Sequence, residues 1–221
     1  MTRDHERHQT GFRRNIRLRD GSLLLIRSFS LNDLFSIHRM YSSLSAESKS
    51  SFHPIFLQPK LRLSWLLDET LQVLSCVSFV RNLLMKIFPR AVYLSLVVLN
   101  SQQKTVAFTY YKLRKRLAGN GFEAEGGTVV KDDYQGRGLG LELLRHRADF
   151  AYANGIRRLR SWVHADNIKM VHLSQKLNYQ KVGLVQRRNP QTGKLYSAWE
   201  MILQLDGPKN TTVKQEVTIS E

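Results

Sequence analysis

Hydrophobic residues along this chain follow two spacings, one typical of strands and one typical of helices. Alternation with a period of two, or a short apolar run bounded by turn residues, indicates a strand. Apolar residues three or four positions apart indicate a helix that faces a core. Strands are expected at residues 22–27, 92–99, 104–113, 122–131, 158–164, 180–187 and 196–205, and helices at 31–44, 66–88, 138–153 and 167–177. The order β-α-α-β-β-β-α-β-α-β-β predicts a mixed α/β domain.

The two ends of the chain lack this patterning. Residues 1–20 are polar and basic, and residues 207–221 stay polar after a Gly-Pro break. We therefore expect a basic N-terminal extension, one domain at 21–206 and a polar C-terminal tail. The expected helix at 66–88 is apolar on two sides. Core burial is its default interpretation, although a homodimer interface or the wall of an acceptor site would use the same pattern.

Composition narrows the class of protein. Lys and Arg number 34 against 18 Asp and Glu, which gives a net charge of +16, and 42% of the residues are hydrophobic. The chain can therefore bury a core, and its charge favours anionic partners such as phosphates, nucleic acid or a membrane face. Cys76 is the single cysteine and excludes a disulfide within the chain. A cytoplasmic protein is therefore expected. The longest uncharged run, 91–103, is too short to span a membrane, so we expect no membrane partner.

A glycine-rich turn carries the strongest functional signal. The segment Gln135-Gly136-Arg137-Gly138-Leu139-Gly140 lies between an expected strand and an expected helix. Glycines let the backbone approach a ligand closely, and the N–H groups and dipole at a helix start favour a phosphate or pyrophosphate. No Lys-Ser or Lys-Thr follows, as a Walker A loop needs, and the glycine spacing is wrong for a dinucleotide-binding Rossmann turn.

The spacing Q-x-x-G-x-G resembles the acyl-CoA pyrophosphate loop of the GNAT N-acetyltransferases. Two further segments, 165–167 (ADN) and 176–179 (KLNY), resemble the family's "N…KLGF" region, and the element order is also similar over about residues 20–206. Segments 18–21 (LRDG) and 44–48 (LSAES), with Glu125 ten residues before the turn, resemble the Pat-like protein-lysine acetyltransferase branch. The resemblance implies an α+β fold, with a mostly antiparallel twisted sheet of about six to seven strands and about four helices.

The resemblance also implies a donor and its binding residues. Acetyl-CoA would supply the acetyl group, and no metal is implied. Asn167 is expected to cap a helix, with a CoA contact as a further role. Ser174 stands where many GNAT enzymes place a tyrosine that protonates the leaving thiolate, so this chain departs from the commonest pattern. The implied donor-binding residues are Val129, Val130, Gln135, Gly136, Arg137, Gly138, Leu139, Gly140, Asn167 and Ser174.

Two glutamates on the expected strand 122–131 are candidates for the general base. An amine acceptor must lose a proton before it attacks a thioester, since a lysine side chain has a pKa near 10.4. Glu123 and Glu125 project to the same face of the strand. The resemblance assigns the base to Glu125, acting through water without an acyl-enzyme, with Glu123 as the alternative. Both could instead solvate the strand and pair with basic residues.

The acceptor is a primary amine that the sequence does not specify: a protein lysine, a protein N-terminus or a small molecule. Two other functions remain open. Basic clusters at 112–116, 157–160 and 187–188 suggest a nucleic-acid-binding protein on a GNAT scaffold, which is not favoured because no binding motif or stacking aromatics accompany them. A catalytically silent acyl-CoA sensor is the other alternative. The net charge disfavours polybasic acceptors.

Overall fold

The fold is known from a computed structural model that describes residues 12–52, 92–118, 121–189 and 192–207. One eight-stranded sheet runs through it in the order β1-β2-β3-β4-β5-β6-β8-β7, and only the β5–β6 pair is parallel. The strands are β1 Arg13–Arg17, β2 Leu23–Ser28, β3 Tyr93–Leu99, β4 Thr105–Arg116, β5 Phe122–Val130, β6 Ile156–His164, β7 Gln180–Arg188 and β8 Leu195–Gln204. The α-helices of the described residues are α1 Leu34–Ser42, α2 Ala46–Ser51, α5 Leu139–Ala153 and α6 Ile168–Lys176. This confirms the expected α+β fold, with slightly more strands than expected.

The structure contains two elements that the sequence did not predict, strand β1 and helix α2. Strand β1 pairs antiparallel with β2, so the sheet begins inside the stretch assigned to a basic extension. Ile16 is the one buried residue of β1, and a single apolar position produces no alternation. Helix α2 has no buried residue, so it shows no helical periodicity either. The expected helix at 66–88, with Cys76, lies outside the described residues.

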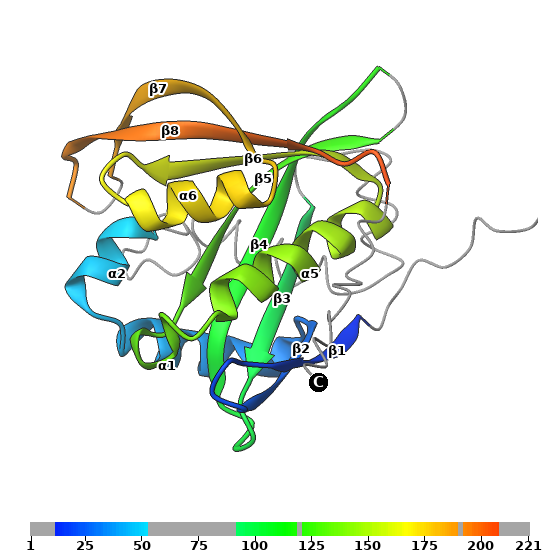
Figure 1. Cartoon of the computed structure of the whole chain (residues 1–221), viewed down its shortest axis with the longest axis vertical. Coiled ribbons are helices and arrows are strands. Elements are labelled where there is room, and N and C mark those ends of the chain that lie inside the picture. Colours follow the sequence, from blue (N-terminus) through cyan, green and yellow to red (C-terminus); the bar gives the residue numbers. More distant parts are fainter. Residues whose placement is uncertain (1–11, 53–91, 119–120, 190–191, 208–221) are drawn as a thin grey trace, which may run out of the picture.

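Helices cover both faces of the sheet (Figure 1). α5 and α6 lie on one face, where buried residues such as Leu143 and Val171 share a core with Ala124 and Leu159 of the sheet. α1 lies on the other, where Ile37 packs with residues of β3, β4 and β5. Alternation along each strand therefore sends neighbouring side chains into different environments.

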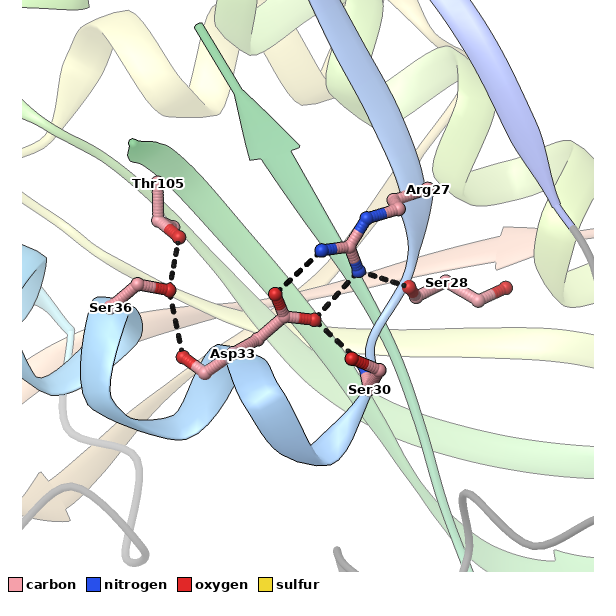
Figure 2. A network of polar contacts seen from close by, with 6 residues as sticks. All are labelled: Arg27, Ser28, Ser30, Asp33, Ser36 and Thr105. Atoms are coloured by element: carbon pink, nitrogen blue, oxygen red, sulfur yellow. Dashed lines mark hydrogen bonds and ion pairs between the residues drawn. The ribbon is translucent and has the colours of Figure 1, made fainter. Parts of the chain in front are cut away.

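A partly buried ion pair fixes the start of α1 against the sheet (Figure 2). Arg27 of β2 donates to both carboxylate oxygens of Asp33, each at 2.7 Å, and the backbone N–H of Ser30 donates to the same carboxylate. The hydroxyls of Ser36 and Thr105 lie 2.7 Å apart and link α1 to β4. Because bidentate pairs fix orientation as well as distance, α1 has a defined position on β2 and β4.

Candidate functional site

The parallel strands β5 and β6 separate part of the way along their length. They pair only from Phe122–Ile156 to Glu125–Arg160. Beyond that point β5 stays paired with β4 as far as Val130, while β6 stays paired with β8 as far as His164 (Figure 1). Peptide groups on the facing edges of the two strands therefore have no strand partner across the split. An extended ligand can use such edges for main-chain hydrogen bonds.

The glycine-rich turn follows β5 directly and leads into α5. Gly136 and Gly138 have φ values of 75° and 90°, in the left-handed region that favours glycine, and Gly138 is the N-cap of α5. A Cβ on Gly136 would meet nothing within 4 Å, and one on Gly138 would meet Arg19 at 3.5 Å, an ordinary contact. The backbone conformation, rather than crowding, therefore requires glycine at both positions.

The start of α5 presents free N–H donors beside the split. The N–H groups of Leu141 and Glu142 turn back to the carbonyl of Gly138, at 3.1 and 3.3 Å. Those of residues 137–140 have no acceptor within the described parts of the chain. Because these donors lie at the positive end of a 15-residue helix, they suit an anion such as a pyrophosphate.

Arg137 does not point freely into this position. Its guanidinium lies 3.2 Å from the carboxylate of Asp20 and 5.3 Å from the ring centre of Tyr134. The pKa of Asp20 is lowered, chiefly by the N–H of Ser22 and to a smaller extent by Arg137. A contact between Arg137 and a bound phosphate therefore stays a prediction, and the backbone supplies the donors that the fold has already positioned.

A network of hydrogen bonds holds the turn in shape. Asp132 accepts from the N–H of Ser45 at 2.7 Å, from the Ser48 hydroxyl and from Gln135 Nε2 at 3.1 Å. The hydrogen bond from Ser48 is the main reason why the pKa of Asp132 is lowered. Gln135 also donates to the carbonyl of Val130 at 3.0 Å. The glutamine of Q-x-x-G-x-G thus connects the strand end, the turn and the start of α2.

Glu123 is buried among cations. Its side chain is 4% exposed and its carboxylate lies 3.2 Å from Arg160, 3.3 Å from Arg158 and 3.9 Å from Lys115. Its position on β5 is inside the paired part of the β5–β6 ladder. A carboxylate held this way contributes to the cohesion of the sheet.

Glu125 is the last β5 residue that pairs with β6, so its carboxylate marks the start of the split. Its side chain is 27% exposed, and its nearest cations are Arg114 at 3.5 Å and Arg187 at 3.9 Å. The shortest ion pair of Glu125 is longer than that of Glu123, and the Glu125 side chain is more exposed to solvent. Glu125 is therefore the more accessible of the two candidate bases.

Aromatic residues that the sequence did not single out lie on β6 and β8, and Arg187 connects one of them, Trp162, to Glu125. The guanidinium of Arg187 lies 4.4 Å from the ring centre of Trp162, and the ring of Tyr196 stacks on His164 at 3.9 Å. Burial lowers the pKa of His164, which favours its neutral form at neutral pH. These residues come from β6, β7 and β8, whose pairing is not readable from the sequence.

The remaining candidates lie around α6 and the end of β5. Asn167 Oδ1 accepts from the N–H of Met170 at 3.0 Å, which confirms the expected cap. Ser174 is buried on α6, and its carbonyl accepts from the N–H of Tyr179 at the end of the turn. Val129 is buried in the core under α1. Contacts of these residues with CoA stay predictions.

The basic clusters seen in the sequence are largely engaged within the protein. Lys112 and Arg116 lie over the rings of Tyr93 and Phe122, at 5.0 and 4.9 Å. Arg157 lies 4.0 Å from the ring centre of Tyr152. Other members of the clusters pair with Glu123, Glu125 and Glu200. These contacts reduce the number of cations that a nucleic acid could use.

The described residues hold neither a metal site nor a membrane span. They contain no group of three or more His, Cys, Asp or Glu placed to bind a metal ion. None of their helices is long and apolar enough to cross a membrane.

Comparison with known proteins points to one family. The model of the acetyltransferase (GNAT) family matches residues 62–179, more than half of the chain. No curated protein sequence matches the chain.

Solved structures share the fold at low sequence identity. The GNAT domain of PAT from S. lividans is 23% identical, with a TM-score of 0.58, over 87% of this chain and 97% of that one. Spermidine N-acetyltransferase from Vibrio cholerae, solved with CoA and spermine, is 17% identical with a TM-score of 0.57, over 82% and 95%. An acetyltransferase of the GNAT family from Streptococcus pneumoniae is 19% identical with a TM-score of 0.57, over 82% and 99%.

Proposed function

The chain belongs to the GNAT acetyltransferase family, and from this premise we propose that it moves an acetyl group from acetyl-CoA directly to a primary amine. One observation carries the proposal: β5 and β6 separate immediately beyond Glu125, and β5 continues along the split to the turn before α5, where the N–H groups of residues 137–140 have no acceptor in the described chain. The anion site at the start of α5, the split between β5 and β6 and the carboxylate of Glu125 thus lie in that order along β5. This is the order of groups that an acyl-CoA and an attacking amine require.

The donor would be held mainly by the backbone. The pyrophosphate would accept from the N–H groups of residues 137–140 at the start of α5, where the helix dipole favours negative charge. The pantetheine arm would then lie in the split, against the edge of β5 near Val129 and Val130. Asn167 and Ser174, at the N-cap and in the last turn of α6, would line the other side.

The transfer needs a base and no nucleophilic side chain. A water between Glu125 and the acceptor takes a proton from the ammonium group, and Glu125 takes a proton from that water. Glu125 then passes this proton to solvent. The neutral amine attacks the thioester carbon, the carbon–sulfur bond breaks with its electron pair staying on sulfur, and the second proton of the attacking nitrogen leaves through the same water to Glu125. We assign the base to Glu125 because three cations surround Glu123 within the paired part of the sheet.

Glu125→Gln tests this assignment. The amide keeps the size of the side chain but cannot accept the proton, so we expect kcat to fall at least about tenfold, within the range that general base catalysis contributes. CoA affinity should stay within about twofold of wild type, because the backbone donors are unchanged. The measurement is thiol release from acetyl-CoA across a panel of amino acids, polyamines, aminoglycosides and peptides, with CoA affinity from calorimetry.

Asp206→Asn is the matched control, since Asp206 is an exposed carboxylate beyond β8. It should leave both quantities unchanged. If Glu125→Gln has the same kcat/KM as wild type from pH 6 to 9, Glu125 is not the base. If wild type binds CoA but consumes no acetyl-CoA with any amine, the chain is a silent acyl-CoA sensor.

The acceptor is an amine that approaches Glu125 from the face carrying Trp162 and Arg187. We propose a protein lysine, a protein N-terminus or a small-molecule amine as acceptor. The Vibrio cholerae spermidine N-acetyltransferase was solved with spermine, a small-molecule amine, which supports including the third class. Mass spectrometry of acetylated products in a native lysate would separate the three classes.

A further inference from the structure

Arg147 of α5 is a buried cation with no counter-ion among the described residues. It is 1% exposed, one of the most buried side chains of the molecule. No carboxylate of the described ranges forms an ion pair with it. Burying a charge that is not neutralised destabilises a folded protein. The fold therefore maintains a positive potential here at the expense of stability.

The guanidinium of Arg147 lies where β5 and β6 separate. Nη1 donates to the hydroxyl of Thr128 on β5 at 3.0 Å, and Nη2 donates to that of Ser161 on β6 at 3.3 Å. Ser161 is the first β6 residue beyond the last pair, Glu125–Arg160. Arg147 thus bridges the two strands near the closed end of the split, one residue beyond the last pair on β6 and three residues beyond it on β5.

The groups around the guanidinium do not neutralise it. The ring of Tyr111 lies 4.5 Å beneath it, and the Tyr111 hydroxyl donates to the Arg147 carbonyl at 3.0 Å. Burial raises the pKa values of both Tyr111 and Tyr179, so the two phenols stay neutral. Of the five N–H donors of a guanidinium, two are used by the hydroxyls, and Nε has no partner in the described part of the chain.

The position along α5 suits the reacting end of the donor. Arg147 is eight residues beyond Leu139, about 12 Å along a helix that rises about 1.5 Å per residue. A pyrophosphate at the start of α5 would therefore send the pantetheine arm along the split towards Arg147. The departing sulfur carries a negative charge as the carbon–sulfur bond breaks, and a fixed cation stabilises such a charge.

We propose that Arg147 is the electrostatic stabiliser of the CoA thiolate, acting through the closed end of the β5–β6 split. This rests on the proposed function. The amine nitrogen forms its bond to the acetyl carbon, the carbon–sulfur bond breaks, and the electron pair remains on sulfur as a thiolate beside the guanidinium. The amine's proton leaves through water to Glu125 and then to solvent. No proton donor to sulfur is needed.

Binding of the product tests this without any turnover. Desulfo-CoA keeps every other group of CoA but has no thiol, so the affinity ratio of CoA to desulfo-CoA isolates the sulfur. In wild type we expect the affinity of CoA relative to desulfo-CoA to increase as the pH rises from 6 to 9. The increase should begin at a lower pH than that at which the thiol of free CoA loses its proton. A thiol pKa lowered by one unit corresponds to about a tenfold tighter thiolate complex.

The affinity ratio of CoA to desulfo-CoA also corrects for the other titratable groups near Arg147. Tyr110 and Tyr111 of β4 and Tyr179 of the α6–β7 turn interact with the guanidinium, and Glu125 and Arg160 lie on the opposite face of the sheet. Where their protonation affects the parts that CoA and desulfo-CoA share, the two affinities change equally and the ratio stays the same. Glu125→Gln should therefore leave the gain of CoA over desulfo-CoA in place.

Arg147→Met should abolish the pH-dependent increase of CoA affinity over desulfo-CoA affinity. Arg147→Lys should keep part of it, since lysine has the charge but lacks the planar pair of guanidinium nitrogens. Two results would overturn the proposal. The first is parallel binding of CoA and desulfo-CoA to wild type at every pH, which is decisive even where Arg147→Met fails to fold. The second is an unchanged pH-dependent ratio in a folded Arg147→Met protein. Failure of wild type to acetylate any amine would instead overturn the proposed function.

Discussion

Glu123 and Glu125 occupy the same face of β5, two positions apart, but their surroundings differ. Three cations enclose the Glu123 carboxylate, which is 4% exposed. Glu125 contacts two cations, the nearer at 3.5 Å, and stands at the start of the split. The period-two spacing predicts the shared face but cannot distinguish the two residues, because the cations come from β4, β6 and β7. One residue therefore stabilises the sheet while the other is available for chemistry.

Glu123→Gln should mainly lower stability. It removes the negative charge from a position where Lys115, Arg158 and Arg160 converge and leaves those cations partly desolvated. Those cations retain some solvent contact, so we expect a loss of about 2 kcal/mol in the free energy of unfolding, below the cost of breaking a fully buried pair. Urea denaturation followed by circular dichroism measures this.

Glu125→Gln is the control for that measurement, because partly exposed pairs contribute at most about 1 kcal/mol. A Glu123→Gln protein as stable as wild type, or less stable by no more than Glu125→Gln, would contradict the structural role of Glu123. A folded Glu123→Gln protein should also keep most of its acetyl transfer.

The β5–turn–α5 unit is the most predictable part of the molecule. Its helix is expected at 138–153 and lies at Leu139–Ala153, and the spacing of the glycines in the turn already indicates the family. β1 is not predictable because Ile16 is its single buried residue. The burial of Arg147 is not predictable either, since an arginine inside an amphipathic helix normally marks a solvated face. The features that the sequence does not predict thus depend on contacts between elements distant in the chain.

Gly138→Ala should distort this unit. Gly138 has a φ of 90°, and a left-handed conformation costs an alanine roughly 1–2 kcal/mol. We expect the unfolding free energy to fall by about 1 kcal/mol or more, and CoA affinity to fall with it, because the N–H groups of the turn change direction. Thermal denaturation and calorimetry measure the two effects.

Gly183→Ala on β7 is the matched control. Its φ is not positive, and an added Cβ would meet nothing within 4 Å. It should leave both stability and CoA affinity close to wild type. If Gly138→Ala binds CoA as wild type does, the turn does not hold the pyrophosphate through its backbone.

The net charge of +16 sets the long-range electrostatic field of the whole molecule. Locally, many of the cations are paired with carboxylates or lie over aromatic rings. On the face that carries Glu125, three glutamates stand among five cations. Arginines and lysines of the basic clusters also lie over aromatic rings. The local arrangement therefore gives less support to nucleic-acid binding than the charge count suggests. The excess charge remains a long-range field that screening by salt weakens.

That field should select among amine acceptors. A polyamine such as spermidine is repelled at long range, so its kcat/KM should rise as NaCl increases from about 50 to about 500 mM, because salt shortens the Debye length from above about 10 Å to a few ångströms. An amino acid or an acidic peptide should show no rise or a fall. Acetyl-CoA must be saturating at each salt concentration, since its own phosphates are attracted by the same field. A kcat/KM for spermidine that falls with salt would show that carboxylates near Glu125 dominate acceptor binding and that the global charge does not set the substrate class.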